Sequence, residues 1–258
     1  MIKMPKILVL FASISDNETY DPILKILKKN KISFDFKIYS AHKTPDEVEK
    51  TVQGDYSVII SGAGLAAALP GVIASKTLRP VIGVPCHGSY EGLDALLSIV
   101  QVPPGIPVLA VGVNQSETAA INALCMLKSY DVVTIIGDQK TEAVRKATDV
   151  LKKFEVPHKF STSPNANSIN IEFTYFDEPV QKNDNLVIYC PLLLDKDDKA
   201  EAALNLLEHS NHGLWVGLNN GANAALAAIE ILNISNAYEQ KLTNYRKEMA
   251  EKIKGYNK

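Results

Sequence analysis

Short apolar runs alternate with amphipathic stretches along the whole chain. The runs with strand character are Ile7–Phe11, Phe34–Tyr39, Tyr56–Ile60, Val81–Pro85 and Val108–Val113. Between the first two, apolar residues recur at the i, i+3, i+4, i+7 spacing of a helix. Strands that alternate with helices are typical of a parallel sheet covered on both faces. We therefore expect an α/β fold, a three-layer parallel sheet of flavodoxin or Rossmann type.

The second half of the chain repeats the pattern of the first. Val132–Gly137 is similar to Ile7–Ala12, and Leu214–Leu232 is similar to Val108–Leu127. This self-similarity predicts a tandem duplication, with a first domain over residues 1–129 and a second over residues 130–258.

The second copy is expected to be the shorter one. We assign its shortening to the counterpart of Gly62–Gly71. It also has Ser161-Thr-Ser-Pro164 where the first copy has Ser40-Ala-His-Lys-Thr-Pro45. The second copy is therefore predicted to be degenerate, retaining the scaffold without the polar groups.

Composition and charge exclude several classes of function. The 258 residues are 46% hydrophobic and carry 27 Lys and Arg against 29 Asp and Glu, a net charge of −2. No basic excess favours nucleic acid or an anionic membrane as a partner. The longest apolar stretch, residues 57–75, contains Pro70 and three glycines and predicts a buried strand followed by a helix rather than a membrane span.

The cysteines and histidines give no sign of a disulfide framework or a metal site. Cys86, Cys125 and Cys190 are scattered, which suits a reducing cytoplasm, and the apolar run at the N-terminus has no cleavage site typical of a signal peptide. His209 and His212 form the only close histidine pair, and we expect that segment to be a solvated loop without bound metal.

Ligands of open parallel sheets bind at the carboxyl ends of the strands, so the loops there are the candidate site. Ser13, Ser15 and Asp16 follow the first strand and precede a helix, whose free N–H groups attract phosphate. The same residues also allow a purely structural interpretation, because Ser15 and Glu18 match a capping box. Ligand binding and capping both remain open here.

The loop after the second strand has the one histidine well placed for proton transfer. Ser40, Ala41, His42 and Lys43 precede a helix that Thr44-Pro45 is predicted to open. A histidine exchanges protons near neutral pH, and a lysine neutralises phosphate as a point charge. A surface loop with a chance histidine is the alternative.

The loop after the third strand is rich in glycine and apolar residues. Gly62 and Gly64 would let the backbone approach a ligand, with Ala63 and Leu69 as part of an apolar wall. The segment also mimics a dinucleotide-binding fingerprint, but the acidic residue needed about twenty positions later is absent. We therefore do not expect a dinucleotide cofactor.

Five segments within residues 5–128 together closely resemble the PurE family of purine synthesis, and in two of them the mutase branch of that family. The segments are Ala12–Asp16, Tyr39–Pro45, Gly62–Gly71, Pro80–Pro85 and Gly92–Pro107. The resemblance implies a mutase that moves a carboxylate from the exocyclic nitrogen of an imidazole ribonucleotide to ring carbon 4. CO₂ is the implied intermediate, and no cofactor or metal is implied. The resemblance also implies that the second copy ends in a long helix over Asn236–Ile253.

The resemblance also implies roles for individual residues. His42 matches the catalytic histidine, and Ser13 and Asp16 match ligands of the phosphate and the ribose. Ser40, Ala41 and Lys43 match the loop that closes over the phosphate. Moving a carboxylate requires one proton to be carried between nitrogen and carbon, and a pocket from which CO₂ cannot escape.

Three positions depart from the family pattern. Ala12 replaces a glycine, Lys43 replaces an arginine and loses its bidentate fork, and Ala68 replaces a histidine that lines the pocket. We hypothesise that His87, in the next loop, compensates for Ala68, in which case replacing His87 would impair turnover as much as replacing His42.

Assembly and the second copy leave further alternatives. Family members form octamers with sites across subunit boundaries, so a chain with two copies is expected to form a homotetramer. Asn223, at a helix start in the second copy, either serves a neighbouring active site or caps that helix. Direct carboxylation of aminoimidazole ribonucleotide with CO₂, a related azole nucleotide reaction, and a non-catalytic assembly or regulatory role are the alternatives to a mutase.

Overall fold

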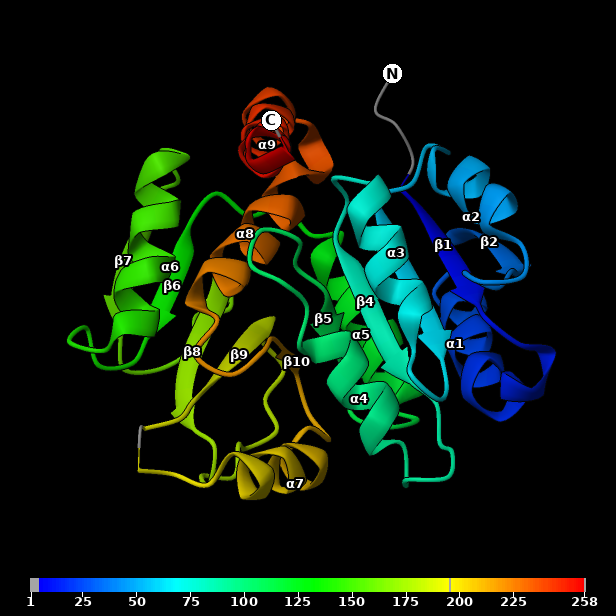
Figure 1. Cartoon of the computed structure of the whole chain (residues 1–258), viewed down its shortest axis with the longest axis horizontal. Helices are drawn as coiled ribbons and strands as arrows, with labels where there is room; N and C mark the ends of the chain where they lie inside the picture. Colours follow the sequence, from blue (N-terminus) through cyan, green and yellow to red (C-terminus); the bar gives the residue numbers. More distant parts are fainter. Residues whose placement is uncertain (1–4, 195, 258) are drawn as a thin grey trace.

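A single mixed sheet runs through the computed structural model of the chain, which describes residues 5–194 and 196–257 (Figure 1). Over these residues the sheet has ten strands in the order β2-β1-β3-β4-β5-β10-β9-β8-β6-β7. The first four residues of the predicted first domain and the last residue of the second lie outside the described residues. Every strand pair is parallel except β5 with β10.

The first half of the sheet has the strand order 2-1-3-4-5 of a flavodoxin-like fold. Its elements, in chain order, are β1 (Lys6–Phe11), η1 (Ile14–Asp16), α1 (Asn17–Lys29), β2 (Ser33–Ile38), α2 (Pro45–Val52), β3 (Val58–Ala63), α3 (Ala68–Lys76), β4 (Val81–Pro85), α4 (Leu93–Val100), β5 (Leu109–Ala110) and α5 (Ser116–Met126). The α/β expectation is thus confirmed, and Pro45 begins α2 as predicted.

The second half repeats that strand order with fewer helices. Its elements are β6 (Val133–Ile136), α6 (Glu142–Lys153), β7 (His158–Ser161), β8 (Ile169–Tyr175), β9 (Val187–Leu192), α7 (Lys199–His209), β10 (Leu214–Trp215), α8 (Gly221–Leu232), η2 (Asn233–Ser235), α9 (Glu239–Lys254) and η3 (Gly255–Asn257). Because β5 and β10 pair antiparallel, at Ala110 and Trp215, the carboxyl ends of the strands in the two halves point in opposite directions.

Two hydrophobic cores lie on the two faces of this sheet. One joins the sheet to α1, α5, α6 and α8, and it extends without interruption from the first half into the second. The other joins it to α2, α3, α4 and α7. The shared sheet and shared cores fix the two halves relative to each other.

The second half has no counterpart of α2 or α3. Residues 162–168 connect β7 to β8 and residues 176–186 connect β8 to β9, both without a helix. The first half uses residues 39–57 and 64–80 for the same two connections. The expectation that the shortening is confined to the counterpart of Gly62–Gly71 is therefore wrong, since the larger loss is at the counterpart of α2.

The segment of the two close histidines is not the solvated loop that was expected. α7 ends at His209, Ser210 is fully buried, and the Trp215 indole N–H donates to the carbonyl of His212 at 2.7 Å. The side chain of Gln115 in the first half donates to Asn211 Oδ1 at 3.3 Å. These residues belong to the contact between the halves.

The last helix of the chain, α9, lies at the top of the view in Figure 1, and its Arg246 donates to the carbonyl of Ala74 near the carboxyl end of α3. Gly105, with φ +101°, packs against α9, where a Cβ would lie 2.2 Å from Met249 Sδ. No helix of the described residues is both long enough and apolar enough to cross a membrane.

Candidate active site

Three polar side chains follow β1 in the turn η1. Ser13 Oγ accepts from the Ser15 amide at 3.2 Å, and the two hydroxyl oxygens lie 2.7 Å apart. Ser13 therefore caps this turn, whereas Asp16, at the cap position of α1, makes no side-chain capping bond. The predicted capping box of Ser15 and Glu18 is not formed, and two hydroxyls lie together at the carboxyl edge of the sheet.

Asp16 has an unpartnered oxygen at the base of this turn. Its Oδ2 is buried and accepts no hydrogen bond. Burial raises the pKa of Asp16, although hydrogen bonds with Ser15 and Cys86 oppose the shift. Burial and the charge of Asp16 raise the pKa of the Cys86 thiol to about 12, so Cys86 is a neutral thiol at physiological pH. The free lone pairs of Asp16 suit a ligand hydroxyl.

The loop after β2 is held by side chains of its own. Ser40 Oγ accepts from the amides of His42 and Lys43, each at 3.3 Å, and Thr44 Oγ1 accepts from the Ser40 amide at 2.9 Å. Thr44 thus folds the loop instead of capping α2, for which no side-chain capping bond forms. The side chains of His42 and Lys43 remain exposed.

A cavity of about 350 Å³ lies between this loop and the loop after β3. The predicted site residues that line it are Ser40, Ala41, His42, Lys43, Ala63, Gly64 and Leu69. Ala12, Leu65, Ala66 and Ala68 complete the lining. Apart from His42, Lys43 and Ser40 the side chains are apolar, so the cavity has one ionisable edge and a wall without side-chain donors.

Two glycines of the β3 region have different roles. A Cβ at Gly62 would lie 2.0 Å from Cε1 of Phe11, so Gly62 is required by packing against that ring in the core. A Cβ at Gly64 would have no neighbour closer than 3.6 Å. Gly64 lines the cavity and Gly62 does not, so the expectation that Gly62 admits a ligand is not supported by its position.

The structure does not bring His87 into the lining of this cavity. His87 Nε2 lies 2.8 Å from Glu91 Oε2, and its side chain is 55% exposed. Ala68 lines the cavity with no histidine opposite it other than His42. Among the described residues, no hydrogen bond between the His87 side chain and the lining of this cavity therefore supports the hypothesis that His87 replaces the pocket histidine.

Sequence reasoning missed Asn114, which joins two of the loops around the site. Its φ is +56°, its amide donates to the carbonyl of Pro85 at 2.9 Å, and its Oδ1 accepts from Thr19 Oγ1 at 3.0 Å and from the His87 amide at 3.1 Å. It therefore ties the start of α1 to the loop after β4. The repeated Val-Gly-x-Asn at residues 111–114 and 216–219 was the signal in the sequence.

Asn223 does not cap α8, the structural role that was expected as one alternative. Asn220 caps α8 by accepting from the Asn223 amide. The buried Asn223 side chain accepts from the Gly105 amide at 2.7 Å and donates to the carbonyl of Pro103 at 3.1 Å. Asn223 thus holds a loop of the first half against α8.

Across residues 5–194 and 196–257, no three His, Cys, Asp or Glu side chains gather where they could hold a metal ion. The site as described consists of a histidine, a lysine, three serine hydroxyls and a half-buried carboxylate around the carboxyl ends of three strands. These groups can transfer one proton and bind an anion.

Comparison with known proteins agrees with this combination of fold and site. Residues 6–135, half of the chain, match the AIR carboxylase family model, and the chain belongs to that family. N5-carboxyaminoimidazole ribonucleotide mutase of Methanocaldococcus jannaschii is 48% identical over 126 residues, covering 48% of this chain and 80% of the relative.

Two further comparisons cover similar shares. The mutase of the same name from Pyrococcus abyssi is 38% identical over 157 residues, 59% of this chain and 87% of the relative. The crystal structure of Treponema denticola PurE is 28% identical with a TM-score of 0.42, covering 46% of this chain and 77% of that one. The family match ends at residue 135, so all but the first six residues of the second half lie outside it.

Proposed function

We propose that the first half of this chain is an N5-carboxyaminoimidazole ribonucleotide mutase of purine synthesis. The observation that carries the proposal is the pairing of His42 with an otherwise mostly apolar cavity. Together with membership of the family and the names of the similar proteins, that pairing favours reversible loss and recapture of CO₂.

In the reaction, the bond between the carboxylate carbon and the exocyclic nitrogen breaks and CO₂ is released inside the cavity. Ring carbon 4 then attacks CO₂, the exocyclic nitrogen takes up one proton, and carbon 4 loses one. His42 is the group that carries this proton, since it is the only histidine among the described residues that line the cavity. Proton count and charge balance without an added reagent.

The substrate is held by the loops beside the cavity. The hydroxyls of Ser13 and Ser15 and the ammonium of Lys43 bind the phosphate, and the unpartnered Asp16 Oδ2 accepts from a ribose hydroxyl. Ala63, Gly64 and Leu69 enclose the CO₂. A cavity that excludes water keeps CO₂ near carbon 4 until it is recaptured.

The assay that tests this compares two substrates with purified protein. The mutase proposal expects conversion of N5-carboxyaminoimidazole ribonucleotide to the 4-carboxy isomer without added bicarbonate. If aminoimidazole ribonucleotide plus bicarbonate is converted and the carboxyamino substrate is not, the protein is a direct carboxylase. If neither substrate reacts, the chain is a non-catalytic member of the family.

We further propose that the catalytic unit is residues 1–129, that residues 130–258 are a degenerate repeat, and that four chains assemble. Three large apolar side chains on loops around the site are exposed, namely Ile14 at 75%, Leu65 at 68% and Tyr90 at 71%. A contact between copies would cover them. Light scattering is expected to give the mass of a homotetramer, and a monomer would contradict the assembly.

A further inference from the structure

A second cavity lies apart from the one lined by His42, with no lining residue in common. Its volume is about 600 Å³, and it lies between the carboxyl ends of α2 and α3 in the first half and α9 in the second. We name it the junction cavity. Its charged lining residues are Lys76, Arg79, Arg246, Lys247, Asp55 and Glu239.

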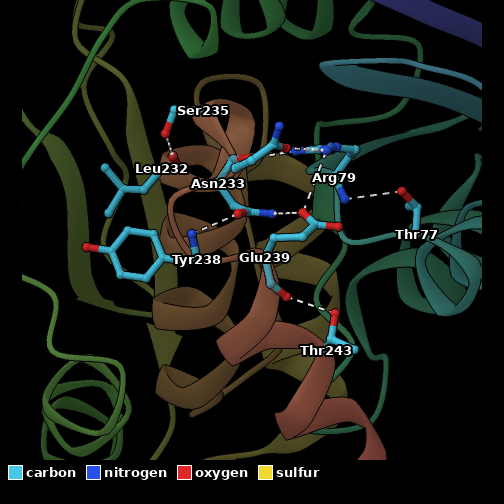
Figure 2. A network of polar contacts seen from close by, with 9 residues as sticks. Thr77, Arg79, Leu232, Asn233, Ser235, Tyr238, Glu239 and Thr243 are labelled. Atoms are coloured by element: carbon cyan, nitrogen blue, oxygen red, sulfur yellow. Dashed lines mark hydrogen bonds and ion pairs between the residues drawn. The ribbon is translucent and has the colours of Figure 1, made fainter.

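Arg79 is held in place at the edge of the junction cavity by three acceptors. Its Nη1 donates to the carbonyl of Asn233 at 2.6 Å, and its Nη2 donates to Asn236 Oδ1 at 2.6 Å (Figure 2). Glu239 Oε2 lies 3.6 Å from the same Nη2 and also accepts from Asn233 Nδ2 at 2.8 Å. The guanidinium therefore has a fixed orientation, and the Glu239 carboxylate is already engaged.

Arg246 is held in the same manner from the α9 side. Its Nη1 donates to the carbonyl of Ala74 at 2.8 Å and its Nη2 to Glu230 Oε1 at 2.8 Å. The side chains of Arg79 and Arg246 are only 20% and 15% exposed. Two preorganised guanidiniums lose little side-chain entropy when they bind an anion.

The carboxyl end of α3 does not oppose an anion strongly. The carbonyls at a helix C-terminus carry partial negative charge. Here Arg246 takes the carbonyl of Ala74, and Gln53 Nε2 donates to that of Lys76 at 3.2 Å. Lys76 pairs with Glu49, but both side chains are at least 40% exposed, and such pairs are weak.

From this arrangement we propose that the junction cavity binds a small phosphorylated metabolite, a phosphate monoester on a hydroxylated body such as a pentose. The lining itself has four cations against two carboxylates, while Glu230 and Glu49 pair with Arg246 and Lys76 from outside the lining. The cationic excess of the lining and the fixed guanidinium of Arg79 favour the anion. The hydroxyl-bearing lining residues Ser75, Thr77 and Thr243 suit a polyhydroxylated body, and the volume lies in the range of small-molecule sites.

The position of the cavity gives such a ligand two effects. It would contact both halves, so it would stabilise their association. It would also contact the end of α3 at Ser75 and Lys76, while the start of the same helix, at Ala68 and Leu69, lines the His42 cavity. The helix α3 therefore joins the two cavities. A ligand in the junction cavity would change the affinity of the His42 cavity for its substrate through this helix.

The test is calorimetric titration of the full chain with ribose 5-phosphate, with ribose as the uncharged control. We expect a binding event that is lost, or weakened at least tenfold, in the double variant Lys76→Glu and Lys247→Glu. The matched control is Lys252→Glu, an exposed reversal on α9 outside the cavity lining, which should bind like the unmodified chain. Catalytic activity without effector should be unchanged in both.

Three results would overturn the proposal. The double variant and the control could bind ribose 5-phosphate with equal affinity, or the unmodified chain could bind ribose as tightly as ribose 5-phosphate. The third is that the one binding event detected is abolished by replacing Lys43. The last result would place the sugar phosphate in the active site alone. The milder Lys247→Gln, whose fold is checked by its thermal midpoint, should give intermediate affinity and guards against misfolding of the double variant. Failure of the mutase assay leaves this readout unaffected.

Discussion

Asn114 and Asn219 occupy equivalent places in the two halves of the chain. Their φ values are +56° and +55°, and their amides donate to the carbonyls of Pro85 and Pro191 at 2.9 and 2.8 Å. Asn114 Oδ1 accepts from the His87 amide at 3.1 Å, and Asn219 Oδ1 accepts from the Leu193 amide at 3.0 Å. Of this pair, only Asn114 also accepts from a threonine of the described residues, Thr19 of α1. The second half thus has the same turn at Asn219, without the bond by which Asn114 reaches α1 in the first half.

This pair gives a first prediction. Asn114→Gly and Asn219→Gly keep the left-handed turn accessible and remove the side-chain bonds, so each should lower the free energy of unfolding by about 1–3 kcal/mol. Only Asn114→Gly should raise the KM for substrate, because only Asn114 ties α1 to the loop after β4. Chemical denaturation and steady-state kinetics measure the two effects, and a similar rise in KM for Asn219→Gly would contradict the assignment.

The two glycines around β3 give a second prediction. Gly62→Ala places a methyl group against the Phe11 ring and should destabilise the fold by about 3 kcal/mol or more, since a strand and a buried ring must move. Gly64→Ala has room for its methyl group and should retain the thermal midpoint while lowering kcat/KM, because the methyl group enters the region of the cavity. The opposite pattern would show that Gly62, and not Gly64, faces the ligand.

The two histidines give a third prediction. His42→Asn should lower kcat about 100-fold or more, because a general acid–base group is lost. His87→Asn should retain most of the activity, because the His87 ring is bound to Glu91 and outside the cavity lining. Single-turnover kinetics on both variants measures the rate of the chemical step and separates the two roles. Equal losses would restore His87 as the replacement for the histidine missing at Ala68.

Glu230 gives a fourth prediction, on stability against pH. Burial raises the pKa of Glu230 to about 8, although Arg246 opposes the shift. Since this folded pKa exceeds the ordinary value of 4.5, the folded chain keeps the proton longer than the unfolded chain does. The contribution of Glu230 to the free energy of unfolding therefore falls as pH rises from about 4.5 to about 8.

Glu230→Gln removes this dependence and keeps an acceptor for Arg246. Relative to the unmodified chain, its thermal midpoint should rise progressively across that pH interval, corresponding to on the order of a few kcal/mol in total. Glu248→Gln, at an exposed pair with Lys153, is the control and should show no such trend. A difference that stays constant with pH would refute the assignment.

Much of the candidate site could be predicted from the sequence, because the end of each apolar run marks the carboxyl end of a strand. The apolar runs that end before Ser13, Ser40 and Gly64 place these loops at one edge of a parallel sheet, and His42 and Leu69 line one cavity as a result. The sequence does not show toward which neighbour a glycine on a strand would point a side chain if it had one. The role of Gly62 therefore became clear only once Phe11 was placed next to it.

Contacts between the halves could not be predicted for a related reason. Asn223 meets Pro103 and Gly105 only because β5 pairs with β10, and the antiparallel sense of that pair has no local signal in the sequence. The shortening of the second half was assigned to the wrong connection. The difference in length shows how many residues are missing, but it does not show which connection between strands lacks them.

The antiparallel contact of β5 and β10 places two similar units about an approximate two-fold axis within one polypeptide. In a homodimer, any substitution at such an interface appears twice and must suit both sides. Here Thr118 and Asn223 stand at equivalent positions and differ, one reaching Asn211 and the other Gly105. On our proposal that residues 130–258 are a degenerate repeat of residues 1–129, the fusion of the two copies releases the interface from self-complementarity. Each side can then evolve, or be engineered, independently of the other.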